Sequence, residues 1–280
     1  MRGSRRVSGT AEAAGSDDGA APGRRYGGAD PTERRDRRRA ALITAGLDVF
    51  GTEGYAKTSV KSVCESAGLT QRYFYESFSD RADLLVAVYD DCVAFVRSAT
   101  VGAVAQFLDH RLATTSAGDA TAETPENATR SQTGSTDPDG PNPHEFDPEG
   151  IAPEHVPDAA RAALGAFMSS LSDDPRRARV MLVEVVGVTP EIEQVRMRAI
   201  HGWAELILTL ARGSRPPSHR QRLASVGLVG AVTQLLVDWY VAGEENADPA
   251  HEQPTQRETL PEILDVCVEL FVAAYERLLT

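Results

Sequence analysis

The chain has 280 residues, of which 41% are hydrophobic, and this allows one large domain or two modest ones. It has no unbroken run of about 18 or more apolar residues and no apolar N-terminal core, so we expect neither a membrane span nor a secretory signal. The net charge of −12 would argue against nucleic-acid binding if it were evenly spread, but the acidic excess lies in residues 113–280, whereas five arginines fall between residues 34 and 39.

The N-terminal part of the chain is expected to be a disordered tail followed by a helix. Residues 1–30 are rich in Gly, Ala, Ser, Arg and Asp and almost lack large apolar side chains. Apolar residues at helical spacing then predict a helix from about Pro31 to Thr52 with one buried face. That face comprises Leu42, Ala45, Gly46, Val49 and Phe50.

Two short helices joined by a glycine turn are predicted between Thr58 and Phe78. Thr58 or Ser59 can cap the first of them, and Gly68 can end it in a left-handed conformation. The second helix has an apolar back and a polar front, and the polar front comprises Gln71, Arg72, Tyr73, Tyr75 and Ser77. This pattern is typical of a helix-turn-helix, whose second helix enters the major groove of DNA.

The rest of the chain shows helical periodicity with one interruption. A fourth helix should run from Arg81 to about Leu112, and the Pro-, Gly- and Thr-rich residues 113–157 predict a disordered insertion. Further helices are expected at about 157–171, 176–186, 190–212, 219–241 and 260–279. No alternating strand pattern is present, so we predict an all-α fold of about nine helices. It would comprise a three-helix DNA-binding domain at 31–80 and a helical sensor and dimerisation domain at 81–280.

The residues around the first four helices also carry a family resemblance. They are Leu42, Ala45, Val49, Phe50, Gly54, Tyr55, Thr58, Ser59, Val60, Val63, Ala67, Gly68, Leu69, Thr70, Phe74, Tyr75, Phe78, Arg81 and Leu84. They extend without a gap through the first helix, the helix-turn-helix and the start of the linking helix, and in this the chain resembles the TetR family of transcriptional regulators. Asp174–Arg179, Glu184 and Thr189–Glu191 are less specifically similar to the family's sensor domains.

The resemblance implies a ligand-responsive regulator in the bacterial cytoplasm, associated with the nucleoid. Such a protein is most often a repressor that binds a palindromic operator as a dimer and is released by a small molecule. The family often has glycine or alanine at the position of Arg72, a small residue at that of Tyr73 and histidine at that of Ser77. We therefore expect the base preference of this chain to differ from that of its relatives.

Nine residues are candidates for DNA contact. Gln71, Arg72 and Tyr73 stand on the first turn of the second helix, where Arg72 could bind guanine and Gln71 adenine, or where they could touch phosphate only. Tyr75 and Ser77 suit phosphate contacts, although Tyr75 could instead pack in the core. Lys57 and Thr58 are further candidates for phosphate contact, and Thr70 is a further candidate for DNA contact. The resemblance implies a phosphate contact for Arg81.

The later helices are candidates for dimerisation and ligand binding. The last two carry apolar residues on more than one face, so we expect them to form a homodimer interface, unless both faces are buried within one subunit. The family binds small molecules among its middle helices, and the candidate lining residues are Phe95, Phe167, Met181, Glu184 and Trp203. Ordinary core packing is the alternative for each, and for Glu184 it is an ion pair with a nearby arginine.

Other functions have less support in the sequence. We expect no enzyme, cofactor or metal site, because there is no Gly-rich phosphate loop, no Gly-x-Ser-x-Gly and no His/Cys cluster at metal spacing. The alternative is a helix-turn-helix protein that acts through protein–protein contacts without a small-molecule ligand. Cys64, Cys92 and Cys267 lie in apolar helical patterns and should be buried thiols, with a redox switch as the alternative.

Overall fold

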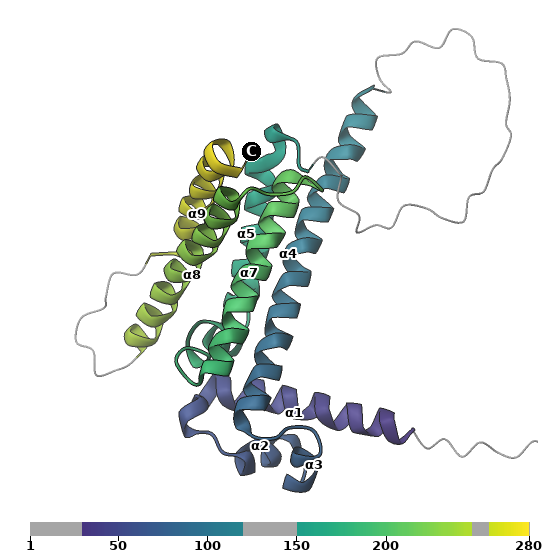
Figure 1. The fold of residues 1–280 in the computed structure, drawn as a ribbon, viewed down its shortest axis with the longest axis vertical. Coiled ribbons are helices and arrows are strands. Elements are labelled where there is room, and N and C mark those ends of the chain that lie inside the picture. Colours follow the sequence, from purple (N-terminus) through teal and green to yellow (C-terminus); the bar gives the residue numbers. More distant parts are fainter. Residues whose placement is uncertain (1–29, 120–149, 248–257, 280) are drawn as a thin grey trace, which may run out of the picture.

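The computed structural model describes residues 30–119, 150–247 and 258–279, and these ranges contain helices and no strand (Figure 1). The predicted all-α fold is confirmed, with nine α-helices in the described ranges. The first four are α1 (Pro31–Glu53), α2 (Val60–Ala67), α3 (Gln71–Tyr75) and α4 (Arg81–Asp119). The other five are α5 (Val156–Ser172), α6 (Pro175–Arg179), α7 (Pro190–Arg212), α8 (His219–Ala247) and α9 (Leu260–Ala274). Four short segments complete the helical structure: η1 (Tyr55–Lys57), η2 (Pro153–His155), η3 (Val180–Glu184) and η4 (Tyr275–Leu279).

Three helices begin with the same capping motif, an N-cap side chain followed by proline. Asp30, Asp174 and Thr189 each accept a hydrogen bond from a backbone N–H of the first turn that follows. The proline after each of them has no N–H to leave unpaired and its φ is already helical. Local sequence therefore fixes where α1, α6 and α7 begin.

Several boundaries differ from the prediction. α8 continues to Ala247 instead of ending at about Val241, and the helix expected at 260–279 is divided into α9 and the π-helix η4. The helix expected to end at Leu112 continues to Asp119, and η2 and the start of α5 also lie within the predicted insertion at 113–157. Adding residues to an established helix costs little once the helix has nucleated, so polar residues after Leu112 still extend α4. The disorder predicted for 1–29 and 120–149 lies outside the described residues.

The single helix expected at 176–186 is divided into α6 and the π-helix η3. A π-helical turn contains about one residue more than an α-helical turn. Val180 and Val185 lie five residues apart and both are fully buried. The wider turn lets both enter one core, which a regular α-helix would not do for this spacing.

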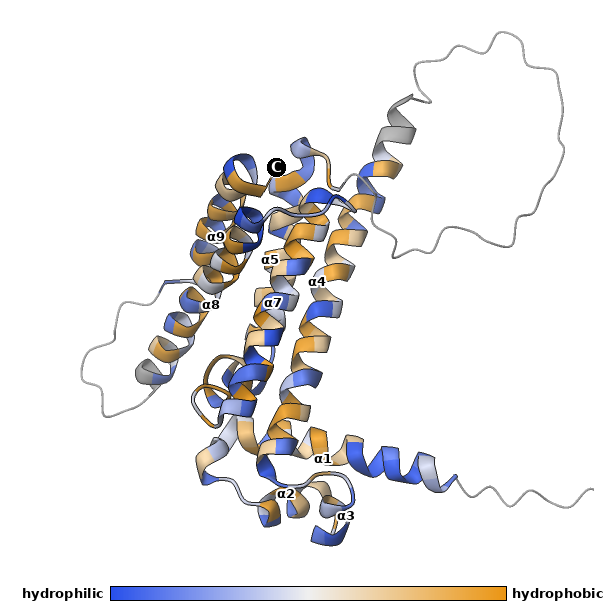
Figure 2. Ribbon diagram, viewed as in Figure 1, coloured by the Kyte–Doolittle hydropathy of each residue, from blue (hydrophilic) through white to orange (hydrophobic). Residues whose placement is uncertain are grey.

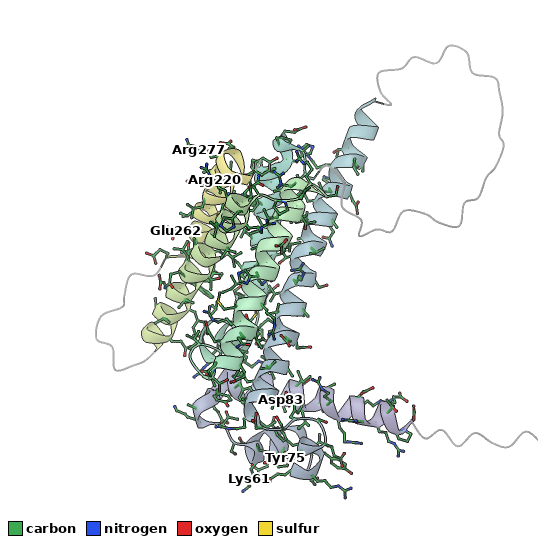
Figure 3. The ribbon with its side chains drawn as sticks, in the orientation of Figure 1. Lys61, Tyr75, Asp83, Arg220, Glu262 and Arg277 are labelled. Carbon is green, nitrogen blue, oxygen red and sulfur yellow. The ribbon has the colours of Figure 1, made fainter. Side chains whose placement is uncertain are left out.

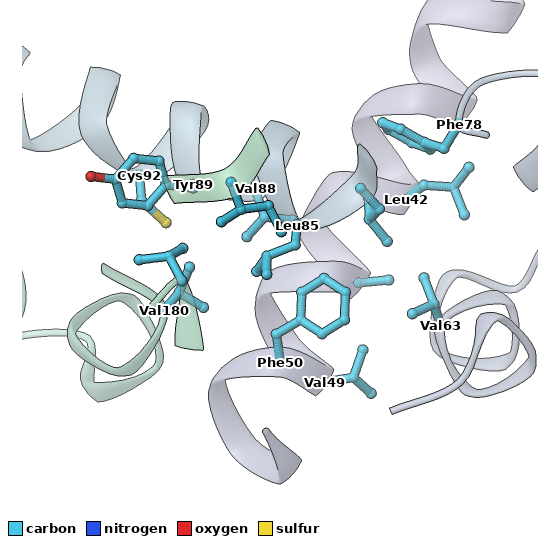
Figure 4. Packing of buried hydrophobic residues seen from close by; sticks show 14 of the residues in the cluster. Leu42, Val49, Phe50, Val63, Phe78, Leu85, Val88, Tyr89, Cys92 and Val180 are labelled. Carbon is cyan, nitrogen blue, oxygen red and sulfur yellow. The ribbon is translucent and has the colours of Figure 1, made fainter. Parts of the chain in front are cut away.

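The N-terminal helices and the C-terminal helical part of the chain share that core. α1 crosses the foot of α4 at a steep angle, with α2 and α3 packed beneath it (Figure 1). Phe50, Val88 and Tyr89 pack in the same cluster as Val180 (Figure 4). Val185, Ile192 and Val195 join this cluster from η3 onward. The two parts are therefore joined by continuous hydrophobic packing rather than by a linker alone.

In the C-terminal helical part, α5 packs on α4 and α9, while α8 packs on α7 and α9. Within α8, His219–Glu244 is long and apolar enough to cross a membrane by length and composition alone, with a mean hydropathy of 1.4, and only 17% of its most apolar stretch is buried. Exposed apolar side chains occur on both α8 and α9, and they include Leu223, Val241, Val266 and Leu270. The pair formed by α8 and α9 thus presents an uncovered apolar surface.

Candidate functional site

α2, a tight turn and α3 form a helix-turn-helix, as predicted. The Ser59 hydroxyl accepts from Ser62 N at 3.0 Å, and the Ser62 hydroxyl accepts from Ser59 N at 2.9 Å, so α2 starts in a reciprocal capping box. Gly68 ends α2 at φ 64°, a left-handed conformation that glycine adopts at little cost. Phe74 and Phe78 are buried with ring centroids 5.7 Å apart, which fixes α3 against the rest of the domain.

The polar front of α3 is exposed. Gln71, Arg72 and Tyr73 on its first turn are all solvent-accessible, and Thr70 before it makes no side-chain capping bond. Tyr75 is 59% exposed, which argues against core packing, and it lies at the end of the molecule remote from the C-terminal helical part (Figure 3). Ser77 is half-buried. α3 therefore offers a row of hydrogen-bonding groups on a rigid apolar base.

Two of the candidate phosphate contacts have internal partners. The hydroxyl of Thr58 is buried and donates to the carbonyl of Gly54 at 2.8 Å. The guanidinium of Arg81 donates to the carbonyls of Tyr55 and Thr58 and lies 4.7 Å from the Tyr55 ring centroid. The sequence predicts phosphate contacts for Thr58 and Arg81, whereas the structure uses their polar groups to hold the loop before α2. Lys57, in the same loop, is exposed.

Arginines of α1 surround the C-terminal end of α3. The N-terminal turns of α1 are strongly hydrophilic and project past α3 (Figure 2). The Glu76 carboxylate pairs with Arg72 Nε at 3.3 Å and with an Arg38 terminal nitrogen at 3.4 Å, and its carbonyl accepts from Arg35 at 3.1 Å. Sequence reasoning missed Glu76, although its i, i+4 spacing from Arg72 is a recognisable pairing signal.

The C-terminal helical part of the chain contains a cavity of about 500 Å³ between α4, α5, η3, α7, α8 and α9. Three of the predicted ligand residues line it, namely Phe167, Met181 and Trp203, and the rings of Phe167 and Trp203 meet edge to face at 5.1 Å. The lining is almost wholly apolar. Its volume lies within the range of small-molecule sites.

Phe95 and Glu184 were both expected in this cavity, and neither lines it. Phe95 lies on the outer surface of α4, where it is 52% exposed and stacked under the Arg177 guanidinium at 4.0 Å. Helical periodicity alone does not distinguish the inner from the outer side of a helix as long as α4. These two predictions are corrected accordingly.

Glu184 instead joins η3 to the N-terminal helices. Its carboxylate accepts from Tyr55 N at 2.7 Å and from Arg179 Nε at 2.8 Å. Arg179 also donates to the carbonyl of Thr52 at 2.9 Å. The pair therefore binds the end of α1 and the start of the helix-turn-helix, in keeping with the alternative of an arginine partner for Glu184.

The cavity is long and has one polar end. Its lining runs from Tyr89 to Val104 on α4 and from Arg196 to Ala211 on α7, which at about 1.5 Å per residue corresponds to roughly 22 Å. Arg196 is a charged side chain in this lining and pairs with Glu193 at 3.0 Å. Burial raises the pKa of Tyr89 to about 12, against the opposing effect of Arg196. Tyr89 is therefore a neutral hydrogen-bonding group beside a cation.

The cavity opens near this polar end. Val183, Val186, Gln234 and Val241 line the cavity and are also exposed to solvent, so they mark the opening. Val104 and Ala211, at the other end, are buried. Arg196 and Glu193 carry a visible i, i+3 ion-pair signal in the sequence, but the sequence does not reveal that Arg196 lines a cavity.

Comparisons with known proteins agree with this architecture. Residues 42–88 match the family model described as bacterial regulatory proteins, tetR family. Among curated proteins, no match to the chain is found.

Several solved structures share the fold. The fatty acid degradation regulator FadR from Bacillus halodurans is 14% identical, with a TM-score of 0.51, over 84% of this chain and 94% of that one. FadR from Bacillus subtilis, solved in complex with stearoyl-CoA, is 13% identical, with a TM-score of 0.50, over 84% and 97%. A TetR-like transcriptional regulator from Rhodococcus sp. RHA1 is 15% identical, with a TM-score of 0.50, over 86% and 96%. At these identities the likeness establishes the fold alone.

Proposed function

Because residues 42–88 match the model of the tetR family of bacterial regulatory proteins, we propose that the chain is a ligand-responsive transcriptional repressor that binds duplex DNA through α3. The observation that carries the proposal is the exposed row Gln71, Arg72, Tyr73 and Tyr75 on a helix fixed by the buried Phe74. Arg72 can make two hydrogen bonds to guanine and Gln71 two to adenine in the major groove. Lys57 and Thr70 supply further groups for the phosphates.

The proposed DNA-binding unit is a homodimer formed through α8 and α9. A single short helix reads only a few base pairs, whereas two copies related by a two-fold axis read a palindrome. The exposed apolar residues Leu223 on α8 and Val266 and Leu270 on α9 supply the surface that such an interface needs.

The proposed effector is an elongated, mainly apolar molecule in the cavity of the sensor domain. The apolar lining and its length of roughly 22 Å suit a long hydrocarbon chain. Arg196 and Tyr89 near the opening suit a polar or acidic head group. The stearoyl-CoA bound by the Bacillus subtilis neighbour makes acyl compounds the first class to test.

The proposed route from effector to DNA runs through η3. Met181, Leu182 and Val183 of this segment line the cavity, while Glu184 at its end accepts from Tyr55 N at the start of the helix-turn-helix. A ligand that displaces η3 must therefore shift the contact to the DNA-binding domain or break it. In a dimer, this would change the distance between the two α3 helices and release the operator.

DNA binding is tested by selecting duplexes from a random-sequence library with the full chain. We expect enrichment of a palindromic sequence and a linear fall of log affinity with log salt concentration. Failure to enrich any sequence, together with equal affinity for enriched and scrambled duplexes at low salt, would contradict the proposed function.

Effector binding is tested by competition against a fluorescent fatty acid, using stearate, stearoyl-CoA, octadecanol and octanoate. We expect long chains to compete better than octanoate, and competing ligands to lower affinity for the selected duplex. Ala163→Phe should block binding because Ala163 lines the cavity. Ser169→Phe, on the exposed side of the same helix, is the control and should bind normally. Selective DNA binding that none of these compounds alters would favour a regulator that acts without such an effector.

A further inference from the structure

We propose that Glu76 and Arg38 are positioning residues for base readout. Glu76 orients Arg72, and Arg38 orients Tyr73, so that α1 takes part in setting the sequence preference of α3. This inference rests on the proposed binding of DNA by α3 and extends it to residues that need not touch DNA themselves.

The geometry is a chain of four side chains in the order Arg72, Glu76, Arg38 and Tyr73. Each carboxylate oxygen of Glu76 takes one arginine: Oε1 lies 3.3 Å from Arg72 Nε, and Oε2 lies 3.4 Å from an Arg38 terminal nitrogen. The Arg38 guanidinium carbon then lies 4.5 Å from the centroid of the Tyr73 ring. Arg35 donates to the carbonyl of Glu76 at 3.1 Å and so ties this position to α1 a second time.

The ion pair with Glu76 restricts the Arg72 side chain but does not occupy the two terminal nitrogens that could contact a base. The Arg72 side chain is 85% exposed, so packing does little to limit its rotamers. The contact with Glu76 uses Nε, whereas a bidentate contact with guanine can use the two terminal nitrogens. The contact at Nε therefore orients the guanidinium of Arg72 in the free protein, which reduces the side-chain entropy lost when DNA binds.

Arg38 has the corresponding effect on Tyr73. Arg38 belongs to α1, and its side chain is only 26% exposed because it packs against α3. A guanidinium over the face of a tyrosine ring is held by cation–π attraction. The contact fixes the plane of the Tyr73 ring and hence the direction of its hydroxyl group. The large side chains at the front of α3 thus each have a partner: Arg72 pairs with Glu76 at the end of α3, and Tyr73 packs under Arg38 of α1.

The charge of Glu76 makes this role separable from simple electrostatics. A carboxylate close to DNA repels phosphates and should weaken binding to every sequence. If Glu76 positions Arg72, its carboxylate should increase the ratio of affinities for the correct and the wrong base pairs. Removing the charge should therefore improve general affinity while it impairs specificity.

The experiment measures affinities of the full chain for the duplex enriched by the wild type and for its single-base variants. Glu76→Gln should bind a scrambled duplex as well as the wild type or better. Its discrimination at the base pair read by Arg72 should fall by about threefold to tenfold, part of what one bidentate contact supplies. Arg38→Gln should lose discrimination at the base pair read by Tyr73. Glu65→Gln is the control, because it removes an exposed acid of α2 that pairs with Lys61 at 3.7 Å and should leave discrimination unchanged.

A double-mutant cycle tests whether Glu76 acts through Arg72. In an Arg72→Ala background, Glu76→Gln should cause no further loss of discrimination. Unchanged discrimination in Glu76→Gln, or an equal loss with and without Arg72, would overturn this inference while leaving DNA binding by α3 intact. Absence of selective binding by the wild type would overturn both.

Discussion

We expect alanine substitutions at Arg72 and Lys57 to have different effects, the first on base specificity and the second on affinity for DNA of any sequence. We expect Arg72→Ala to weaken binding to the selected duplex by about 1–3 kcal/mol and to relax preference at one base pair. Lys57→Ala should instead weaken binding to all sequences alike and reduce the salt slope by about one. Titrations against single-base variants at several salt concentrations measure both effects. A base-selective loss in Lys57→Ala would contradict its assignment to phosphate.

Asp174 should make stability depend on pH in the acid range. Its carboxylate accepts from Arg176 N at 3.1 Å and from Arg176 Nε at 2.9 Å. Hydrogen bonds from Arg176, and the nearby charges of Arg176 and Arg177, hold the pKa of Asp174 below its ordinary value of 3.8. A lowered pKa in the folded state means that the ionised form stabilises the fold above the unfolded pKa. This contribution is lost as the pH falls through the lower folded pKa.

The corresponding test is Asp174→Asn, with Asp173→Asn as an exposed neighbouring control. Asp174→Asn should lower stability at pH 7 by about 1 kcal/mol and should lose less stability than the wild type on acidification below about pH 4. Urea unfolding at several pH values measures the difference. Parallel pH curves for the variant and the wild type would refute the role given to Asp174.

At the scale of elements, the contact between α1 and α6 has almost no spare space. A Cβ at Gly51 would lie 2.3 Å from Arg176 Cβ and 2.6 Å from its Cα, so any side chain there must push α6 away. We expect Gly51→Ala to destabilise the protein by about 1–3 kcal/mol. Gly102→Ala in α4 is the matched control, because nothing lies within 4 Å of its added Cβ, and it should be neutral or stabilising by up to about 1 kcal/mol. Thermal unfolding of the two variants decides the comparison.

The sequence predicts elements well where the signal is local. Capping residues and apolar periodicity place α1, α5, α7 and α9 within a few residues of their observed bounds, and the three cysteines are buried as expected. Burial also raises the pKa of Cys92 to about 12, which favours an inert thiol over a redox switch.

Features that depend on contacts between residues far apart in the sequence could not be predicted from the sequence. The π-helix η3 arises because Val180 and Val185 must both enter a core built by α1 and α4. Glu184 finds its partner 129 residues earlier in the chain, at Tyr55. Arg81 appears basic and exposed in a helical pattern, yet its guanidinium is directed to the carbonyls of Tyr55 and Thr58. In each case tertiary geometry, not local propensity, decides the role.

At the scale of the whole molecule, the apolar surface of α8 and α9 should control assembly. Leu270→Glu places a charge in the proposed interface, so we expect a folded monomer with much weaker binding to the selected palindrome. Leu112→Glu, at an exposed site on α4, is the control and should remain dimeric. Sedimentation equilibrium at micromolar concentration measures both. A monomeric wild type, or a Leu270→Glu variant that still dimerises, would count against this interface.

The core shared by the N-terminal helices and the C-terminal helical part limits how the protein can be divided or recombined. A fragment that ends at residue 80 would lack Val88 and Val180, which pack in the same cluster as Phe50 (Figure 4). A chimaera that grafts residues 31–80 onto a foreign sensor would leave that apolar face uncovered, even if the junction were placed in a surface turn. The transplantable module is therefore discontinuous in sequence. To move the DNA specificity of this protein, an engineer must also carry over the start of α4, α6, η3 and the first turns of α7.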